Sequence, residues 1–99
     1  NLSRLKTKKN MLEEKVTICN KLGLHARAAA KLVGVASEFA AHVEIEKDSK
    51  RVNGKSIMGV MMLAASKGSV ITLYAEGDDA DSAIAKLKKL VLDRFGEHE

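Results

Sequence analysis

The sequence predicts an α+β domain, in which a four-stranded, mainly antiparallel sheet carries three helices on one face. Segments that alternate between polar and apolar residues are interleaved with segments of helical periodicity, in the order βαββαβα. The length of 99 residues fits one domain. The outward positions of the strands are polar, as in a sheet with one face in water. They are Thr17, Glu44, Glu46 and Thr72.

The first half of the domain is expected to form a strand, a helix and a hairpin. β-Branched residues alternate along 14–20, which favours a strand, and Gly23 marks the turn that follows. Apolar residues recur every three or four positions over residues 26 to about 39, which predicts an amphipathic helix. A strand over 41–46 is followed by a polar turn and a short returning strand at 51–52.

The second half is expected to form a helix, a strand and a helix. Ser56 is a suitable N-cap for a short helix to about Ala64, and 69–76 is the most β-rich segment. Asp78 or Asp79 is expected to cap the last helix. The apolar stripe of this helix consists of Ala83, Ile84, Leu87, Leu90 and Val91. The basic residues that complement its dipole are Lys86, Lys88, Lys89 and Arg94.

The net charge of +4 comes entirely from the first ten residues, so residues 11–99 are formally neutral. The chain also has only one Tyr, two Phe and no Trp. Nucleic acid is therefore not expected as the main partner, because the domain offers neither a basic excess nor aromatic residues on which bases stack. We expect residues 1–10 to be a flexible basic extension and residues 11–99 to be the functional domain.

The sequence carries no sign of export or of membrane insertion. No apolar run approaches the roughly 18 residues that span a membrane, and residues 1–10 lack the apolar core of a signal peptide. The single Cys19 cannot form an internal disulfide, which agrees with a reducing compartment. We therefore expect a cytoplasmic protein that makes no membrane contact.

A histidine stands at the start of the first predicted helix, in the stretch GLHARAAA. Its place at or near the N-cap leaves the backbone N–H groups of Ala26 and Arg27 without helical partners, and the helix dipole favours an anion over a protonated imidazole there. The guanidinium of Arg27 is suited to phosphate. Small side chains at Ala26 and 28–30 let a large group approach. The pattern predicts that His25 is a neutral nucleophile beside a phosphate site, which suits a phosphoryl relay.

Two other interpretations of this histidine stay open on the residues alone, since it could cap the helix or simply lie on the surface. A metal site is not expected, because His42, His98 and Cys19 have no ligand spacing to His25. The same spacing gives no support for Cys–His nucleophilic catalysis. No cofactor is expected.

The second helix start contains Gly54-Lys55-Ser56, which superficially resembles a nucleotide-binding loop. Ser49 stands where that loop needs a glycine, so nucleotide binding is not expected. Ser56 is interpreted as an N-cap that can also be phosphorylated, because about two negative charges are locally favourable at a helix N-terminus. The following helix has more bulky apolar residues than one buried face can hide, so some are expected at the surface. They are Ile57, Met58, Val60, Met61, Met62 and Leu63.

The stretches 23–27 (GLHAR) and 53–61 (NGKSIMGVM) together resemble HPr, the histidine-containing phosphocarrier family of the bacterial phosphoenolpyruvate-dependent phosphotransferase system. The resemblance runs from Met11 to about Asp93 and includes the separation of the two motifs. It implies an open-faced β-sandwich. It also implies that His25 accepts phosphate at Nδ1 from phosphorylated enzyme I and passes it to the IIA domain of an enzyme II, with Arg27 beside it. Such a chain is a carrier and not an enzyme with turnover of its own.

The same resemblance implies a regulatory site and a docking surface. Ser56 corresponds to the serine that an HPr kinase/phosphatase phosphorylates in some bacteria. Ile57, Met58 and Met61 would belong to the docking surface beside the first helix, together with Ala30.

One position departs from the common family pattern, which has proline where this chain has Ala28. Alanine is a good helix former, so the local geometry should survive. Some nitrogen-branch relatives, called NPr, look the same at this position. The alternatives are therefore an NPr-type carrier in place of a sugar-transport carrier or, from another class, a small α+β regulatory domain in which His25 is a structural helix cap.

Overall fold

The computed structural model of the chain describes residues 11–99, and the predicted basic extension at 1–10 lies outside them. The elements follow the order expected from the sequence. They are β1 (Met11–Thr17), α2 (Ala26–Ala36), β2 (His42–Lys47), β3 (Lys50–Asn53), α3 (Ile57–Met61), β4 (Val70–Glu76) and α4 (Ala80–Leu92). A single 3₁₀ turn, η1 (Arg94–Gly96), follows α4.

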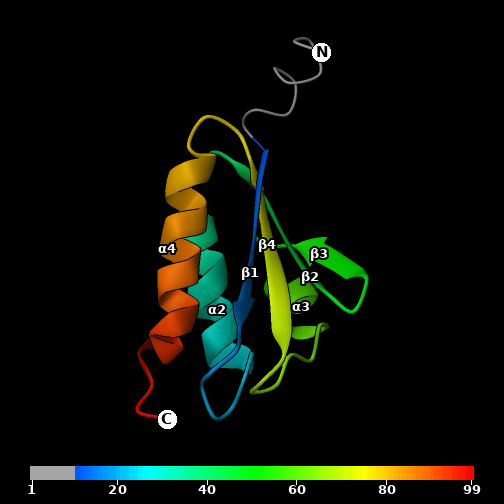
Figure 1. Ribbon diagram of the computed structural model, residues 1–99, viewed down its shortest axis with the longest axis vertical. Coiled ribbons are helices and arrows are strands. Elements are labelled where there is room, and N and C mark those ends of the chain that lie inside the picture. Colours follow the sequence, from blue (N-terminus) through cyan, green and yellow to red (C-terminus); the bar gives the residue numbers. More distant parts are fainter. Residues whose placement is uncertain (1–10) are drawn as a thin grey trace.

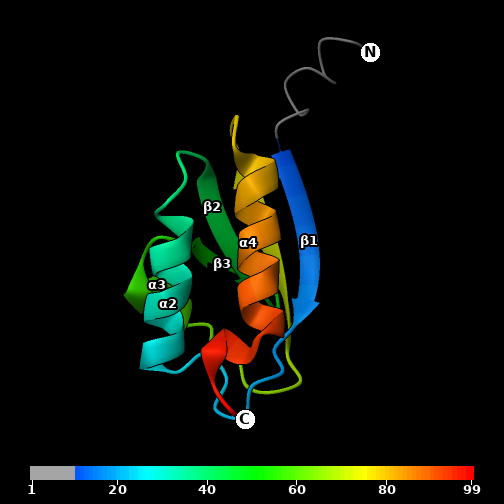
Figure 2. The ribbon, with the colours of Figure 1, turned by 90° about the vertical axis from the view of Figure 1, so that its left-hand side faces the viewer.

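The four strands form one antiparallel sheet in the order β1-β4-β2-β3. The last strand in the sequence, β4, therefore lies between β1 and β2. The helices α2 and α4 lie side by side across one face of the sheet, and α3 packs beside α2 (Figures 1 and 2). The predicted α+β class with an open-faced sheet is confirmed.

The hydrophobic core fills the space between the sheet and the helices. Val43 and Ile45 of β2 and Leu73 of β4 have no exposed surface, as the period-two alternation predicts. On the helix side, Leu32 of α2 and Leu87 of α4 are also fully buried. Each such side chain contributes about 1.5–3 kcal/mol of hydrophobic free energy. The small residues Ala28, Ala29 and Ala36 are likewise buried, and they allow α2 to lie close to its neighbours.

The face of the sheet that turns away from the helices is covered by polar side chains. The hydroxyl of Tyr74 donates a hydrogen bond to Oε1 of Glu46 (3.0 Å). The guanidinium of Arg51 lies 3.8 Å from the centre of the Tyr74 ring and is paired with the same carboxylate at 3.1 Å. Thr17 is exposed on this face. The expectation that one face of the sheet meets water is therefore confirmed.

The first strand begins and ends earlier than the sequence predicted. The expected range was 14–20, whereas β1 covers Met11–Thr17. Every residue of β1 is paired, from Met11 opposite Glu76 to Thr17 opposite Val70. The end of β1 at Thr17 therefore coincides with the start of β4 at Val70, which local alternation cannot reveal. Ile18 and Asn20 are nevertheless buried on the inward side, as the alternation predicted.

The helix ends also differ from the prediction. The structure ends α2 at Ala36, short of residue 39, and α3 at Met61, short of Ala64. Ala64 has a φ of 49°, so the chain turns there. The carbonyl of the following residue, Ala65, accepts a hydrogen bond from the N–H of Leu24 (2.8 Å). The assignment of Arg94 to the last helix is wrong as well, because α4 ends at Leu92 and Arg94 has a φ of 55°.

Asp79 occupies the N-cap position of α4, but its carboxylate makes no cap hydrogen bond. Its oxygens instead accept hydrogen bonds from the backbone N–H groups of Ala40 (2.9 Å) and Ala41 (2.8 Å). The side chain therefore ties the segment before β2 to the start of α4, which corrects its interpretation as a helix cap.

Asp79→Ala is expected to lower the free energy of unfolding by about 1–3 kcal/mol, because two backbone donors lose a charged acceptor. The matched control is Asp78→Ala at the exposed neighbouring position, which should change this free energy by less than about 0.5 kcal/mol. Urea denaturation of both variants measures the difference, and equal losses would contradict the bridging role.

Candidate functional site

The candidate site is built at the N-terminus of α2. His25 is the N-cap residue, with extended backbone angles (φ −73°, ψ 178°), and its carbonyl accepts the first helical hydrogen bond from Ala29 (2.8 Å). The imidazole itself makes no cap hydrogen bond. Among residues 11–99, the backbone N–H groups of Ala26 and Arg27 have no backbone acceptor. Both residues are exposed, so these donors are available to an anion.

The loop before His25 is held in place by a close approach of two backbone segments. Gly23 has a φ of +67°, and a Cβ there would lie 2.4 Å from the carbonyl oxygen of Ala65. Only glycine fits both requirements. The next residue, Leu24, is buried and donates its N–H to the same carbonyl at 2.8 Å. This anchoring leaves His25 half-buried at the rim, directly before the helix.

A carboxylate from the far end of the sequence contacts the imidazole. Nε2 of His25 lies 2.5 Å from Oε2 of Glu97. The other oxygen of Glu97 accepts a hydrogen bond from Nδ2 of Asn20 (3.0 Å), which also donates to the carbonyl of Gly23 (2.9 Å). The ammonium of Lys31 on α2 donates to the carbonyl of Phe95 (2.7 Å) and so holds η1 against the helix.

The electrostatics of this contact determine the charge of Glu97 and so the hydrogen-bonding role of Nε2 of His25. The hydrogen bonds from Asn20 and then from His25 lower the pKa of Glu97, although partial burial opposes them, and the positive charge of Lys31 adds to the lowering. The carboxylate is therefore ionised at neutral pH and can only accept hydrogen bonds. It follows that Nε2 of His25 carries a hydrogen, so that in the neutral ring Nδ1 keeps its lone pair.

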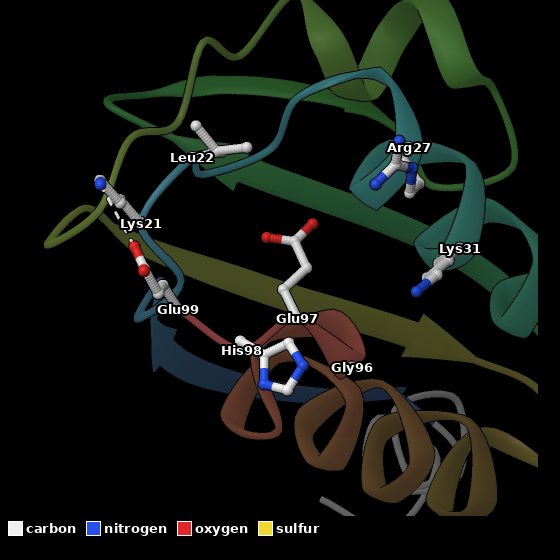
Figure 3. A pocket seen from close by; sticks show the side chains of 8 residues that line it. All are labelled: Lys21, Leu22, Arg27, Lys31, Gly96, Glu97, His98 and Glu99. Atoms are coloured by element: carbon white, nitrogen blue, oxygen red, sulfur yellow. Dashed lines mark ion pairs between the residues drawn. The ribbon is translucent and has the colours of Figure 1, made fainter.

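An open pocket of about 520 Å³ lies beside this contact. Figure 3 shows the carboxylate of Glu97 pointing between the 21–22 segment and the start of α2, with Arg27 and Lys31 on the helix side. Lys21 pairs with Glu99 at 3.2 Å. Arg27 takes part in none of the ion pairs found among residues 11–99. The pocket also contains the carboxylates of Glu97 and Glu99, so the positive charge that it offers to an anion at the helix N-terminus comes from Arg27 and Lys31.

The second predicted site residue, Ser56, is the N-cap of α3. Its hydroxyl accepts a hydrogen bond from the N–H of Gly59 (3.0 Å), which confirms the capping interpretation. The apolar residues behind it are strongly exposed: Ile57 by 43%, Met58 by 72% and Met61 by 38%. Val60, by contrast, is buried.

The helix that carries these exposed residues, α3, packs beside α2, whose first turn holds the first site. Ala30 is exposed on α2. The expectation that part of the apolar set on α3 reaches the surface is therefore confirmed.

Sequence reasoning missed Asn20 and Glu97. One signal was present, because Asn20 stands at an inward position of the alternating segment, where a polar side chain needs a partner. The identity of that partner, 77 residues away, follows only from the fold. Within residues 11–99, no three His, Cys, Asp or Glu side chains are grouped so that they could hold a metal ion.

The family model described as "PTS HPr component phosphorylation site" matches residues 12–93. The chain belongs to the HPr family. It is 51% identical over 89 residues to the phosphocarrier protein HPr of Cupriavidus necator, which covers 90% of this chain and 100% of that protein.

One further curated relative and one solved structure are also similar to this chain. The phosphocarrier protein NPr of Shewanella violacea is 49% identical over 86 residues, covering 87% of this chain and 94% of NPr. The crystal structure of HPr-C-His from Thermoanaerobacter tengcongensis is 50% identical, with a TM-score of 0.86, and covers 89% of this chain and 99% of that one.

Membership in the HPr family confirms the resemblance found in the sequence and supports a phosphocarrier role in the phosphotransferase system. No helix within residues 11–99 combines the length and the apolar character that crossing a bilayer requires.

Glu97→Gln is expected to reduce the dependence of protein stability on acidic pH. The ionised carboxylate stabilises the fold fully above its unfolded pKa of about 4.3, and this stabilisation is lost as the pH falls through the lower folded pKa. The variant should therefore be less stable than the parent at neutral pH, and the difference should shrink below about pH 4. Chemical denaturation across this range measures it.

The control for this measurement is Glu99→Gln, which removes an exposed ion pair with Lys21. Exposed pairs contribute little, so its stability should follow that of the parent at every pH. A loss as large as that of Glu97→Gln would show that the pairing with His25 and Asn20 is not the cause.

Proposed function

We propose that residues 11–99 form a phosphocarrier domain in which His25 accepts a phosphoryl group and passes it on. The observation that carries the proposal is the position of the imidazole, which is half-buried at the N-cap of α2. Within the described residues, the N–H groups of the first helical turn beside it have no backbone acceptor, and the guanidinium of Arg27 takes part in no ion pair. Family membership supports it independently.

The chemistry suits a relay. Nδ1 of His25 attacks the phosphorus, an N–P bond forms, and the bond between phosphorus and the donor breaks. The backbone N–H groups of Ala26 and Arg27, together with the Arg27 side chain, bind the phosphoryl oxygens. In the second step the acceptor's nucleophile attacks the phosphorus, a bond between them forms, and the N–P bond breaks with its electron pair returning to Nδ1. The chain returns to its starting state only through its partners, so it is a carrier and has no turnover of its own.

The proposed donor is phosphorylated enzyme I, and the proposed acceptor is the IIA domain of an enzyme II. Both must reach His25, so they should dock on the exposed surface that adjoins it. Ile57, Met58 and Met61 on α3 supply flexible apolar contacts there, and Ala30 leaves room on α2.

Ser56 is the proposed regulatory site, with an HPr kinase/phosphatase as the modifying enzyme. Its hydroxyl is occupied in the cap of α3, so phosphorylation would exchange a neutral acceptor for about two negative charges at the same helix end. These charges would stand beside Ile57 and Met58 and would repel an acidic partner surface.

A nitrogen-regulatory carrier is the second candidate function. Ala28 favours it, as does the 49% identity to the NPr protein of Shewanella violacea. Single-turnover transfer to a sugar-type and to a nitrogen-type IIA domain separates the two, because the true acceptor should be phosphorylated much faster.

His25→Ala is expected to fold normally and to take no label from radioactive phosphoenolpyruvate and enzyme I, because the acceptor nitrogen is gone. His42→Ala and His98→Ala, at exposed positions, are the matched controls and should be labelled like the parent. Acid-labile label that persists in His25→Ala would rule out the proposed acceptor.

Met58→Glu is expected to slow phosphoryl transfer from enzyme I by about tenfold or more, because it places a charge in the middle of an apolar docking surface. The side chain is 72% exposed, so stability should hardly change. Leu92→Glu is the matched control, since this side chain is 55% exposed on α4. Equal rates in both variants would show that partners dock elsewhere.

A further inference from the structure

Three of the four methionines in the chain stand within five positions, at residues 58, 61 and 62. Residues three and four apart are neighbours on a helix surface, so Met58 adjoins both Met61 and Met62. The N–H of Met62 donates a hydrogen bond to the carbonyl of Met58 (3.0 Å), so one helical turn contains all three. Their side chains therefore lie on one side of α3 and its C-cap, and we call them the methionine cluster.

The methionine cluster faces solvent, although methionine is among the residues that are most often buried. Met58 and Met62 are exposed by 72% and 62%, and Met61 by 38%. Val60 and Leu63 are buried and provide the contact of this segment with the hydrophobic core. A chemical change in the methionine cluster therefore alters the surface of the domain and leaves the packing of α3 in place.

Exposed thioethers react with peroxides to form methionine sulfoxide. The lone pair of Sδ attacks one peroxide oxygen, an S–O bond forms and the O–O bond breaks. The sulfur loses two electrons, the peroxide is reduced, and its second oxygen leaves as water with the proton of the first. The product is a polar, chiral sulfoxide in place of a flexible apolar side chain.

We propose that the methionine cluster is an oxidation site, at which a peroxide weakens partner docking without unfolding the domain. Oxidation places S=O dipoles in the apolar surface that includes Ile57, and a docked partner would cut these dipoles off from water. Methionine sulfoxide reductases remove the oxygen, so the change is reversible. The docking part of this inference rests on the proposed function, whereas the oxidation itself does not.

Methionine also suits this surface for another reason, because its flexible side chain adapts to different partners. The two roles differ in what they change. Adaptability affects docking of the untreated chain, whereas an oxidation site affects the ratio of the transfer rates before and after peroxide treatment. The ratio is therefore the quantity that tests the inference.

The remaining methionine is an internal control. Met11 is exposed by 46%, more than Met61 and less than Met58, so a peroxide reaches it as well. It begins β1, at the opposite edge of the sheet from β3, the strand against which α3 packs (Figure 2). A sulfoxide at Met11 is expected to leave docking unchanged. The other oxidisable sulfur belongs to the half-buried Cys19, and dithiothreitol returns it to the thiol without reducing sulfoxides.

The first test maps the oxidation and does not depend on phosphorylation. The chain is treated with hydrogen peroxide, and peptide mass spectrometry measures the sulfoxide at each methionine. Met58 and Met62 should be oxidised fastest and Met61 more slowly, in the order of their exposure. The circular dichroism spectrum and the urea midpoint should stay close to those of the untreated chain. Absence of sulfoxide at Met58 and Met62, or unfolding of the oxidised chain, would overturn the inference.

The second test measures phosphoryl transfer from enzyme I to the oxidised chain. The kcat/KM should fall about tenfold, because dipoles without water replace apolar contacts, whereas kcat at saturation should stay the same. Methionine sulfoxide reductases A and B, one for each epimer of the sulfoxide, should restore kcat/KM. A fall in kcat alone would indicate damage at His25 and would contradict the docking role.

Two variants show which methionines are responsible, and each is compared with itself before and after peroxide treatment. The triple variant Met58→Leu, Met61→Leu and Met62→Leu should keep its own kcat/KM, since leucine is apolar and has no sulfur. Met11→Leu should lose as much as the parent chain. Equal losses in the two variants would overturn the assignment to the methionine cluster.

The two proposals fail in different ways. A parent chain that takes no phosphate from enzyme I would overturn the proposed function and, with it, the effect of oxidation on docking. A parent chain that is phosphorylated normally, with the same kcat/KM before and after full oxidation, would overturn the role of the methionine cluster alone.

Discussion

The burial of a small-residue face of α2 against the rest of the molecule is the constraint on which the site depends. Ala28, Ala29, Leu32 and Ala36 have no exposed surface, so the helix can move neither along nor away from the sheet without opening the core. The first turn of the helix is thereby fixed, and the loop before it is held by the carbonyl of Ala65. Because both the helix and the loop are fixed, His25 and the free N–H groups of this turn reach solvent at a defined position.

A second constraint is electrostatic. A histidine at a helix N-terminus meets the positive end of the dipole, which disfavours charge on the ring. The fold sets the carboxylate of Glu97 against Nε2, on a segment that η1 and Lys31 bring back to the start of α2. The ring therefore lies between a partial positive charge from the helix and a full negative charge from Glu97. Such an arrangement suits a group whose charge changes during its work.

The surface divides into areas with different chemistry. On the open face of the sheet, the polar groups of Arg51, Tyr74 and Glu46 bind one another. The exposed apolar side chains belong to α3, which packs beside α2. In the proposed function, a partner that docks there needs no deep pocket, because the imidazole of His25 reaches the surface. The arrangement agrees with the phosphocarrier role of the HPr family.

The sequence by itself determined the element order, the inward faces of the strands and the start of α2, because these depend on local periodicity and on residues such as Gly23 and Ser56. It also indicated His25 and Arg27 as the candidate site, since a helix N-terminus is a local feature. The strand order, the end of β1 and the bridging role of Asp79 required the tertiary structure, because each depends on a segment distant in the sequence. The same holds for Glu97. Nothing near it in the sequence connects it to His25, and only the packing of η1 against α2 brings the carboxylate to the imidazole.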